Sequence, residues 1–164
     1  MKPSFRAVGR RFQRGSIAVE AAFSLLILVA FALFESLNWA VYFYQYAAAQ
    51  KAVHDAGLYL MTAPRLELTT AGADGNPAAL AIARKIIASE MAGISYPEPS
   101  IVCNYRQASG IPVPKQCTTA GNQDYKQPLI QISVAIDMIY INPLTGNITE
   151  LRISPYAHVP YVGD

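Results

Sequence analysis

The stretch Gly15-Ser16-Ile17-Ala18-Val19-Glu20, with the apolar run over residues 21–34 that follows it, decides the fold of this chain. Residues 17–34 carry a single charge, that of Glu20. As an α-helix they would be about 27 Å long at 1.5 Å per residue. That length nearly matches the hydrocarbon core of a bilayer, about 30 Å. We therefore predict one transmembrane helix near the N-terminus.

Basic residues precede this stretch and acidic residues do not. The first fifteen residues hold five of the thirteen lysines and arginines and none of the eleven aspartates and glutamates. The remaining residues therefore carry eight basic and eleven acidic side chains, a net charge of −3. Because positive flanking charge stays on the cytoplasmic side, we predict a cytoplasmic N-terminus and an exported body. The body lacks the basic face that nucleic-acid binding requires, so nucleic acid is not an expected partner.

The helix is expected to continue past the bilayer. Glu35 and Asn38 mark its exit, and an interfacial belt of aromatic residues is predicted just beyond. The belt consists of Trp39, Tyr42, Tyr44 and Tyr46. Residues 47–56 contain neither proline nor glycine, and Pro64 is the first firm stop. We predict a basic leader over residues 1–15, one transmembrane and spine helix over residues 16–62, and a further domain over residues 63–164.

A ridge of small side chains runs along the second half of this helix, at Ala48, Ala52 and Ala56. Such a ridge permits close packing. We expect it to pack against the protein's own sheet rather than against a neighbouring chain.

The remaining sequence predicts an α+β domain with a second helix and a small antiparallel sheet. Asn76 and Pro77 read as the N-cap and first turn of a helix over residues 78–92, after a loop over residues 69–76. The expected β-structure is a short strand (100–106), a loop (106–126), a long alternating strand (128–140), a turn (142–147) and a returning strand (148–154) that residues 156–161 extend.

Two cysteines, Cys103 and Cys117, lie in the distal half. If that half is exported they can form a disulfide, which would close a loop of about 15 residues and contribute roughly 3 kcal/mol. In a reducing cytosol they would remain two free thiols. The topology argument favours the disulfide.

Two carboxylates, Glu20 and Glu35, invite an acid–base interpretation. They lie fifteen residues apart, about 22 Å along a helix, so they cannot share a proton or a substrate. The histidines His54 and His158 show no metal-ligand spacing and no nucleophile motif, and we interpret them as ordinary surface residues. We therefore predict a protein that is not an enzyme and that needs no metal or cofactor.

Glu20 has a more specific interpretation as an assembly contact. A carboxylate at mid-membrane costs about 2.5–3.5 kcal/mol and is rarely found there without a partner. A cytoplasmic peptidase that recognises a basic leader ending in glycine would cut between Gly15 and Ser16. The new ammonium group on Ser16 would then lie about one turn from Glu20, where each charge satisfies the other. Between chains, the same pairing would set the axial register.

This combination resembles the prepilin-type (class III) signal of type IV pilins and pseudopilins. More narrowly, Gly15-Ser-Ile-Ala-Val-Glu20-Ala-Ala-Phe-Ser-Leu-Leu, with Glu35 at the helix exit, resembles the TadE family of minor pseudopilins from tight-adherence (Flp, type IVc) pilus systems. The tail Ile139-Tyr140-Ile141-Asn142-Pro143-Leu144, followed by residues 148–154, is similar to that family's closing strand pair. Major Flp pilins are much shorter and usually have tyrosine where this chain has Ala21, which favours a minor pseudopilin. The TadE, TadF and TadG subtypes are not separated by these residues.

The resemblance implies a single-pass protein of the bacterial inner membrane with a periplasmic C-terminal domain. It implies a prepilin peptidase that cuts between Gly15 and Ser16, and an assembly role for Glu20, with Glu35 as a candidate second contact at the helix exit. The implied partners are the peptidase, the pilus assembly platform proteins, other pilins or pseudopilins, and membrane lipid. The implied role is pilus assembly or initiation, for surface adhesion and biofilm formation.

Two other interpretations remain open at this point. The chain could be an ordinary secretory protein that is cut after Ala49, although its apolar region exceeds the usual 7–15 residues. It could also be an uncleaved single-span protein whose periplasmic domain binds a ligand or an envelope component.

Overall fold

The computed structural model describes residues 9–72, 75–107, 109–117, 127–142, 145–146 and 148–163, with the backbone alone described over residues 9–16 and 148–150. The chain divides into two compact units, Met1–Val41 and Tyr42–Asp164. The described part of the first unit belongs to a single helix, α1, which runs over Gly9–Thr62. All side chains over residues 17–37 are exposed. Within Ile17–Thr62, α1 is long and apolar enough to cross a membrane once.

Helix α1 begins earlier than expected, at Gly9 rather than at Ser16. Residues 10–14 include three arginines and a glutamine, which are good helix formers. Adding them to an existing helix requires no new nucleus, whereas an isolated leader helix would need one. The other end falls at Thr62, as predicted, because Pro64 has no N–H and disfavours helical geometry in the residue before it.

The second unit is built around the last part of α1. One face of this segment is fully buried, at three- and four-residue intervals that bring side chains onto one side of a helix. The buried residues are Ala49, Ala52, Val53, Ala56 and Leu60. The predicted alanine ridge is therefore covered by the protein's own domain at Ala52 and Ala56, while Ala48 is half-exposed.

Two further helices accompany α1. Helix α2 is a short turn over Arg65–Thr69, and helix α3 covers Ala78–Glu90. The predicted cap of α3 is wrong by one position: Pro77 is the N-cap, and no side chain caps the helix. The side chain of Asn76 instead accepts a hydrogen bond from Arg84 Nη1 at 3.2 Å, which takes its oxygen away from the helix amides.

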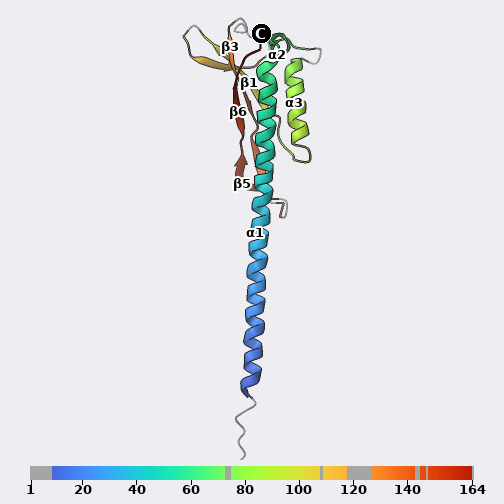
Figure 1. Cartoon of the computed structure of the whole chain (residues 1–164), viewed down its shortest axis with the longest axis vertical. Coiled ribbons are helices and arrows are strands. Elements are labelled where there is room, and N and C mark those ends of the chain that lie inside the picture. The colour runs from blue at the N-terminus through green and yellow to red at the C-terminus, as the bar shows by residue number, and fades with distance from the viewer. Residues whose placement is uncertain are drawn as a thin grey trace, which may run out of the picture. The chain divides into compact units, whose positions relative to one another are not determined.

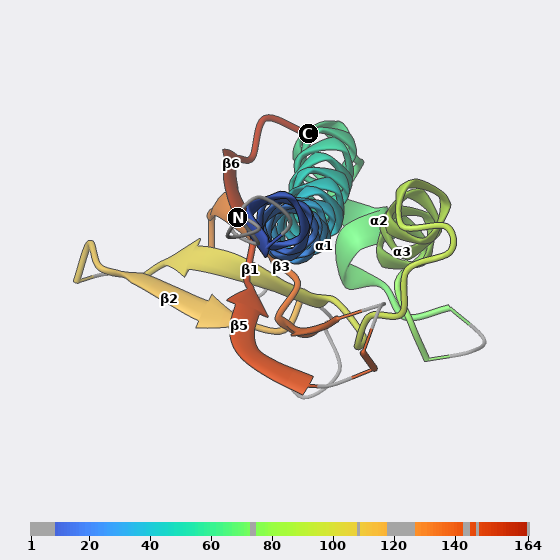
Figure 2. The same cartoon turned by 90° about the horizontal axis from the view of Figure 1, so that it is seen from below.

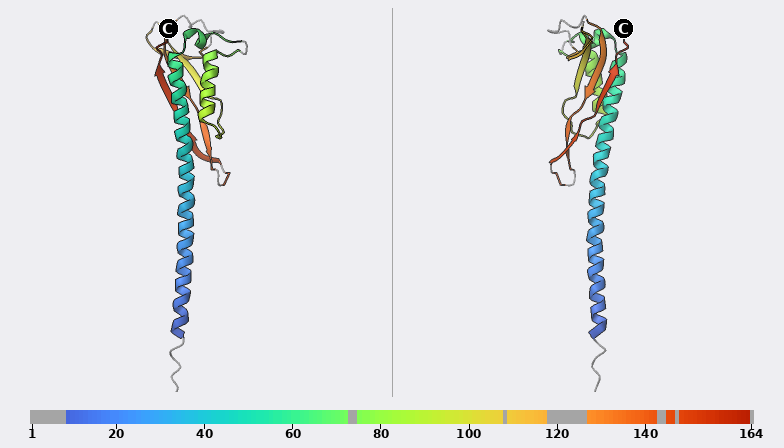
Figure 3. Two further views of the ribbon diagram at one scale, coloured as in Figure 1. Left: turned by 45° about the vertical axis from the view of Figure 1, so that its right-hand side comes forward. Right: turned by 90° about the vertical axis from the view of Figure 1, so that its left-hand side faces the viewer.

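The strands form two antiparallel sheets. Strands β1 (Ser100–Arg106), β2 (Pro112–Lys115), β3 (Leu129–Ala135) and β6 (Tyr156–Pro160) form a four-stranded sheet in the order β2-β1-β3-β6. Strands β4 (Met138–Ile141) and β5 (Ile148–Ile153) form a two-stranded sheet. Figures 1 and 2 show the last part of α1 between the four-stranded sheet and α3, and both views in Figure 3 place β6 alongside α1. The α+β fold class is confirmed.

The predicted long strand over residues 128–140 is wrong as a single element, because it breaks at Ile136 and Asp137. The facing chain breaks at the same level, at Ser154 and Pro155. Ala135 pairs with Tyr156, and three residues further along Met138 pairs with Ile153, so both pairings share one register. Residues 156–160 therefore do not extend β5 as predicted. They form a separate strand that continues the same ribbon into the other sheet.

The break has a local cause. Proline fixes its own φ and cannot donate to a ladder, and aspartate is a poor strand former. The carbonyl of Pro155 still accepts a hydrogen bond from the Ile136 amide at 3.1 Å. Ser154 Oγ donates to Asp137 Oδ1 at 2.7 Å. The Ile136 amide and the Ser154 hydroxyl therefore both have hydrogen-bond partners at the point where the ribbon passes from one sheet to the other.

The predicted loop over residues 106–126 contains a strand that the sequence pattern did not reveal. Strand β2 pairs with β1 in a register that sets Cys103 opposite Lys115. Because proline is unfavourable in strands, Pro112 and Pro114 argue against a strand here when only the sequence is considered. However, β2 is an edge strand, where proline is tolerated. Residues 118–126 of the predicted loop lie outside the described residues.

Candidate functional site

The predicted processing and assembly residues all lie on α1. Gly15 and Ser16 belong to its helical backbone, and Glu20 follows about one turn later. The side chains of Glu20 and Glu35 are exposed, and none of the described side chains forms an ion pair with Glu20. The segment therefore presents a carboxylate on the outside of an apolar helix. In a membrane such a carboxylate is costly unless a cationic group neutralises it.

The two cysteines form the predicted disulfide. Cys103 lies on β1 and Cys117 lies two residues beyond β2, with their Cα atoms 5.0 Å apart. Both are buried, and the described part of the chain has no free cysteine. Because β2 is an edge strand, the disulfide ties the outermost part of the sheet to the next strand.

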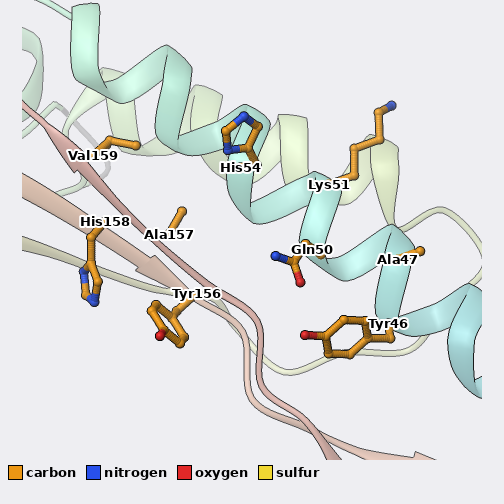
Figure 4. Close-up of a pocket in the computed structure, with 9 residues that line it drawn as sticks. All are labelled: Tyr46, Ala47, Gln50, Lys51, His54, Tyr156, Ala157, His158 and Val159. Carbon is orange, nitrogen blue, oxygen red and sulfur yellow. The ribbon is translucent and has the colours of Figure 1, made fainter.

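A groove of about 640 Å³ lies between α1 and the edge strand β6, entirely within the second unit. Its lining residues are Tyr46, Ala47, Gln50, Lys51, His54, Tyr156, Ala157, His158 and Val159. Figure 4 shows Ala157 and Val159 directed toward α1, with Tyr156 and His158 on the other side of the strand. Helix α1 and strand β6 approach closely beside this groove: a Cβ placed on Gly57 would lie 3.2 Å from Cγ1 of Val159, one of the lining residues.

The structure brings His54 and His158 to the same groove, which the sequence did not predict. They lie more than one hundred residues apart, and no spacing pattern connects a helix residue with a residue on the last strand. Among the described residues, no group of three or more histidine, cysteine, aspartate or glutamate side chains could hold a metal ion.

A short chain of hydrogen bonds crosses the sheet beside this groove. Asn104 Nδ2 donates to Ser133 Oγ at 2.9 Å, and Ser133 Oγ lies 2.7 Å from His158 Nδ1. The ring of Tyr156 lies over His158, with centroids 5.1 Å apart. A serine next to a histidine is the beginning of a nucleophile–base pair, but such a pair also needs an oxyanion site and a group that orients the histidine. The described contacts of His158 include no carboxylate, and the three side chains form a polar network across β1, β3 and β6.

Neighbouring charges and burial perturb titratable side chains of the second unit, among them Lys51 and Tyr105. The hydrogen bond from Lys51 Nζ to Glu90 Oε2, 2.6 Å long, raises the lysine pKa and ties α1 to α3. Burial raises the pKa of the Tyr105 phenol, while the charge of Arg65 acts in the opposite direction. The Tyr105 hydroxyl is fully buried and has no hydrogen-bond partner among the described residues.

Comparison with known proteins finds no match: neither a family model, nor a curated protein, nor a solved structure matches this chain.

Proposed function

We propose that this chain is a TadE-like minor pseudopilin of a tight-adherence (type IVc) pilus. A prepilin peptidase cuts it between Gly15 and Ser16, and it takes part in pilus assembly or initiation for surface adhesion and biofilm formation. The observation that carries the proposal is the position of Glu20. Its exposed carboxylate lies on an apolar helix directly after a basic leader, and this helix continues into a disulfide-bonded α+β domain.

The exposed apolar surface of α1 supports an intermolecular role. Every side chain over residues 17–37 is exposed, and most of them are large and apolar. A surface of this kind requires lipid or protein around it. A carboxylate within it needs a cationic partner, and the new N-terminus of a processed chain, its own or a neighbour's, would supply one.

The disulfide supports an exported second unit. Disulfides persist in the periplasm and outside the cell and are rare in the reducing cytosol. The basic leader supports the same orientation, because it would hold the N-terminus in the cytoplasm.

Processing is tested by N-terminal sequencing of the protein purified from membranes. We expect a mature chain that starts at Ser16 in cells with the prepilin peptidase and an uncut chain in cells without it. Gly15→Val should block the cut, because a branched side chain replaces the glycine next to the scissile bond. Gly9→Val makes the same change inside the leader and should leave processing intact. A mature chain that starts at Gln50 would show an ordinary secretory signal instead.

Assembly is tested separately at Glu20. Glu20→Ala should be processed normally but should reduce the number of surface pili counted by electron microscopy. Glu20→Gln keeps the size and removes the charge, and it should show the same loss if pairing with an ammonium group is the cause. An unchanged pilus count in both variants would contradict the assembly role.

A second candidate function is favoured by the groove between α1 and β6. Its volume, about 640 Å³, lies within the range of about 300–1,000 Å³ typical of small-molecule sites. Under this candidate, the chain is an uncleaved single-span protein whose periplasmic domain binds a ligand or an envelope component. It predicts no change of mass when the prepilin peptidase is removed. It also predicts that Gln50→Trp, whose larger side chain would fill the groove, impairs the function of the protein in the cell more than Glu20→Ala does.

A further inference from the structure

Strand β6 is an edge of the four-stranded sheet, and among the described strands it pairs with β3 alone. Two hydrogen bonds at the ends of this pairing show which main-chain groups of β6 face β3. The Tyr161 amide donates to the Ile130 carbonyl at 3.0 Å. The Ile136 amide donates to the Pro155 carbonyl at 3.1 Å, and both bonds follow the register of β3 and β6. In an antiparallel ladder, hydrogen-bonded pairs alternate with pairs whose main-chain groups point away from each other.

The main-chain groups between these two bonds therefore alternate in direction. Those of Ala157 and Val159 face β3, and those of Tyr156, His158 and Pro160 point away from it. Because proline has no N–H, the outward side offers two donors and three acceptors. Successive outward residues are about 6.7 Å apart. None of the hydrogen bonds described between elements uses these groups. They form the unpaired side of a strand, which is a template for a further strand.

The groove between α1 and β6 reaches this unpaired side. Ala157 and Val159 are directed toward α1, whereas Tyr156 and His158 lie on the other side of the strand (Figure 4). A hollow confined to the α1 side of β6 would be lined by the first pair only. Both pairs line the groove. The groove therefore extends around the edge of the strand to the outward main-chain groups.

The groove is long enough for a short piece of extended chain. Its wall on α1 runs from Tyr46 to His54, about 12 Å of helix at 1.5 Å per residue. Its wall on β6 runs from Tyr156 to Val159, about 10 Å of strand. At 3.3–3.4 Å per residue, an extended segment of roughly three or four residues has the same length.

We propose that this groove binds an extended segment of a partner polypeptide, which pairs with β6 as a further strand of the sheet. An extended chain is the ligand that supplies N–H and C=O groups at the spacing of the unpaired edge. An α-helix already satisfies its own main-chain groups and cannot pair in this way. The inference goes beyond the proposed function, because it does not depend on the cut between Gly15 and Ser16 and holds for the cleaved and the uncleaved chain.

The lining of the groove indicates which side chains the segment would carry. Side chains directed toward α1 would lie next to Ala47, Ala157 and Val159, which are apolar and small or medium-sized. This leaves room for large apolar side chains at every second position of the segment. The positions between them would lie beside the rings of Tyr156 and His158. Proline is excluded where the segment must donate an N–H to β6.

Strand β6 of a second copy of this chain meets these requirements poorly. Toward the groove it would present Ala157 and Val159, which are not large. Its own α1 already covers these side chains, since a Cβ on Gly57 would lie 3.2 Å from Val159 Cγ1 and 3.6 Å from Ala157 Cβ. Pro160 would also supply no donor. A partner with a different sequence therefore suits the groove better.

The test uses the full chain in detergent and a library of fluorescent, terminally blocked nonapeptides with a large apolar residue at every second position. Binding is measured by fluorescence anisotropy. The tightest peptide is then prepared in two forms, in which N-methyl groups replace the amide protons of either alternate set of residues. Because alternate amides of a strand face one edge, we expect one form to bind at least about tenfold more weakly than the other. Equal affinities of the two forms, or no binding by any peptide, would overturn the proposal.

A pair of variants tests the same contact from the side of the protein. His158→Pro and His158→Ala both remove the imidazole, but only His158→Pro removes the outward N–H. That N–H does not bond to β3, so proline is compatible with the edge strand. We expect His158→Pro to bind the peptide at least about tenfold more weakly than His158→Ala. Equal binding by two variants with the same thermal unfolding temperature would overturn main-chain pairing. If His158→Pro does not fold, the two N-methylated peptides still decide.

The groove itself is tested by filling it. Ala47→Trp should abolish peptide binding, because the larger side chain would occupy the space beside β6. Leu58→Trp is the matched control, since Leu58 is exposed on α1 but does not line the groove. Equal binding by the two variants would place the peptide elsewhere and overturn the proposal.

Sedimentation of the chain without peptide tests the other occupant. A concentration-dependent dimer that His158→Pro abolishes and His158→Ala retains would show that β6 pairs with a second copy, and it would overturn the partner proposed here. A monomer at every concentration, together with peptide binding, is the expected result. Processing at Gly15 and the pilus counts of the Glu20 variants do not involve the groove. The proposed function can therefore fail while this inference stands, and the reverse.

Discussion

Gly57 on α1 and Val159 on β6 approach so closely that a Cβ placed on Gly57 would lie 3.2 Å from Val159 Cγ1. This is tighter than most side-chain contacts, and Val159 is itself almost fully buried. A glycine inside a helix costs about 0.5–1 kcal/mol relative to alanine. Here the close approach of helix and strand, which a larger residue at position 57 would prevent, offsets that cost.

Enlarging Gly57 should therefore separate α1 from β6. We expect Gly57→Val to lower the free energy of unfolding by about 1–3 kcal/mol, the usual cost of overpacking a core. The measurement is urea unfolding of the detergent-solubilised protein, followed by circular dichroism. Leu58→Val introduces the same branched side chain at the next, exposed position and should change the stability much less. Equal effects of the two variants would mean that helix propensity, and not the contact with Val159, is the cause.

Loss of the disulfide should weaken the β1–β2 edge of the sheet. Cys103 and Cys117 enclose a loop of about 15 residues, for which the chain-entropy model gives roughly 3 kcal/mol. We expect the double variant Cys103→Ala/Cys117→Ala to lose about that much in the free energy of unfolding. Adding a reductant should destabilise the native chain and leave the double variant unchanged. A stability that reductant does not alter in the native chain would contradict a structural role for the disulfide.

The buried hydroxyl of Tyr105 makes the stability depend on alkaline pH. Burial raises its pKa in the folded state above the value of about 10 expected in the unfolded chain. The folded state therefore holds this proton more tightly, and its contribution to stability is complete below pH 10 and is lost as the pH rises through the folded pKa. Tyr105→Phe removes this dependence, so its stability should decrease less steeply above pH 10.

The same variant should also be more stable at neutral pH. The Tyr105 hydroxyl has no hydrogen-bond partner among the described residues, and leaving such a group buried costs about 1–3 kcal/mol. Thermal unfolding at pH 7 and pH 10.5 checks both expectations. Tyr156→Phe, at an exposed position, is the control and should change neither value. A destabilised Tyr105→Phe at neutral pH would show that the hydroxyl has a hydrogen-bond partner.

The C-terminal residues are held against the end of α1. The amides of Val162 and Gly163 both donate to the carbonyl of Met61, at 3.0 and 3.1 Å, and Tyr161 Oη donates to the carbonyl of Ala63 at 3.0 Å. These bonds satisfy carbonyls that a helix end otherwise leaves free. A Cβ on Gly163 would lie 2.5 Å from the Ala63 carbonyl oxygen, so a larger residue does not fit there.

Gly163→Ala should therefore release this segment without unfolding the domain. We expect faster amide hydrogen exchange at residues 162–163 and faster digestion by carboxypeptidase, with a loss of about 1–2 kcal/mol or less in global stability, since roughly two hydrogen bonds are weakened. Val162→Ala changes an exposed side chain next to it and should leave exchange unaltered. Unchanged exchange in Gly163→Ala would mean that the backbone moves to accommodate the methyl group.

The parts of the fold that could be predicted are those whose cause is local. Hydrophobic length predicted α1, and proline predicted its end at Thr62. The short strand expected over residues 100–106 is found at those bounds. The parts that could not be predicted depend on pairing across the chain. Nothing within residues 128–140 shows that Pro155 lies opposite their midpoint and divides the ribbon between two sheets.

The residues of the candidate sites also differ in whether the sequence alone can bring them together. The Gly15–Glu20 motif is contiguous, so its residues are identified without a structure, although its function remains a prediction. The groove and the hydrogen-bond chain from Asn104 through Ser133 to His158 join residues from separate elements. A sequence alone does not place such residues together, because their proximity depends on the strand order β1-β3-β6.

The contact between Tyr161 and Ala63 joins residues 98 positions apart. Since synthesis proceeds from the N-terminus, α1 is complete long before β6 leaves the ribosome, and the domain can close only after almost the whole chain has been made. Until then, the small residues Ala52, Ala56 and Gly57 remain uncovered on the helix. A chain that terminates before residue 156 would lack β6, and these small residues on α1 would stay uncovered permanently. Such a product should be a preferred substrate for chaperones and envelope proteases.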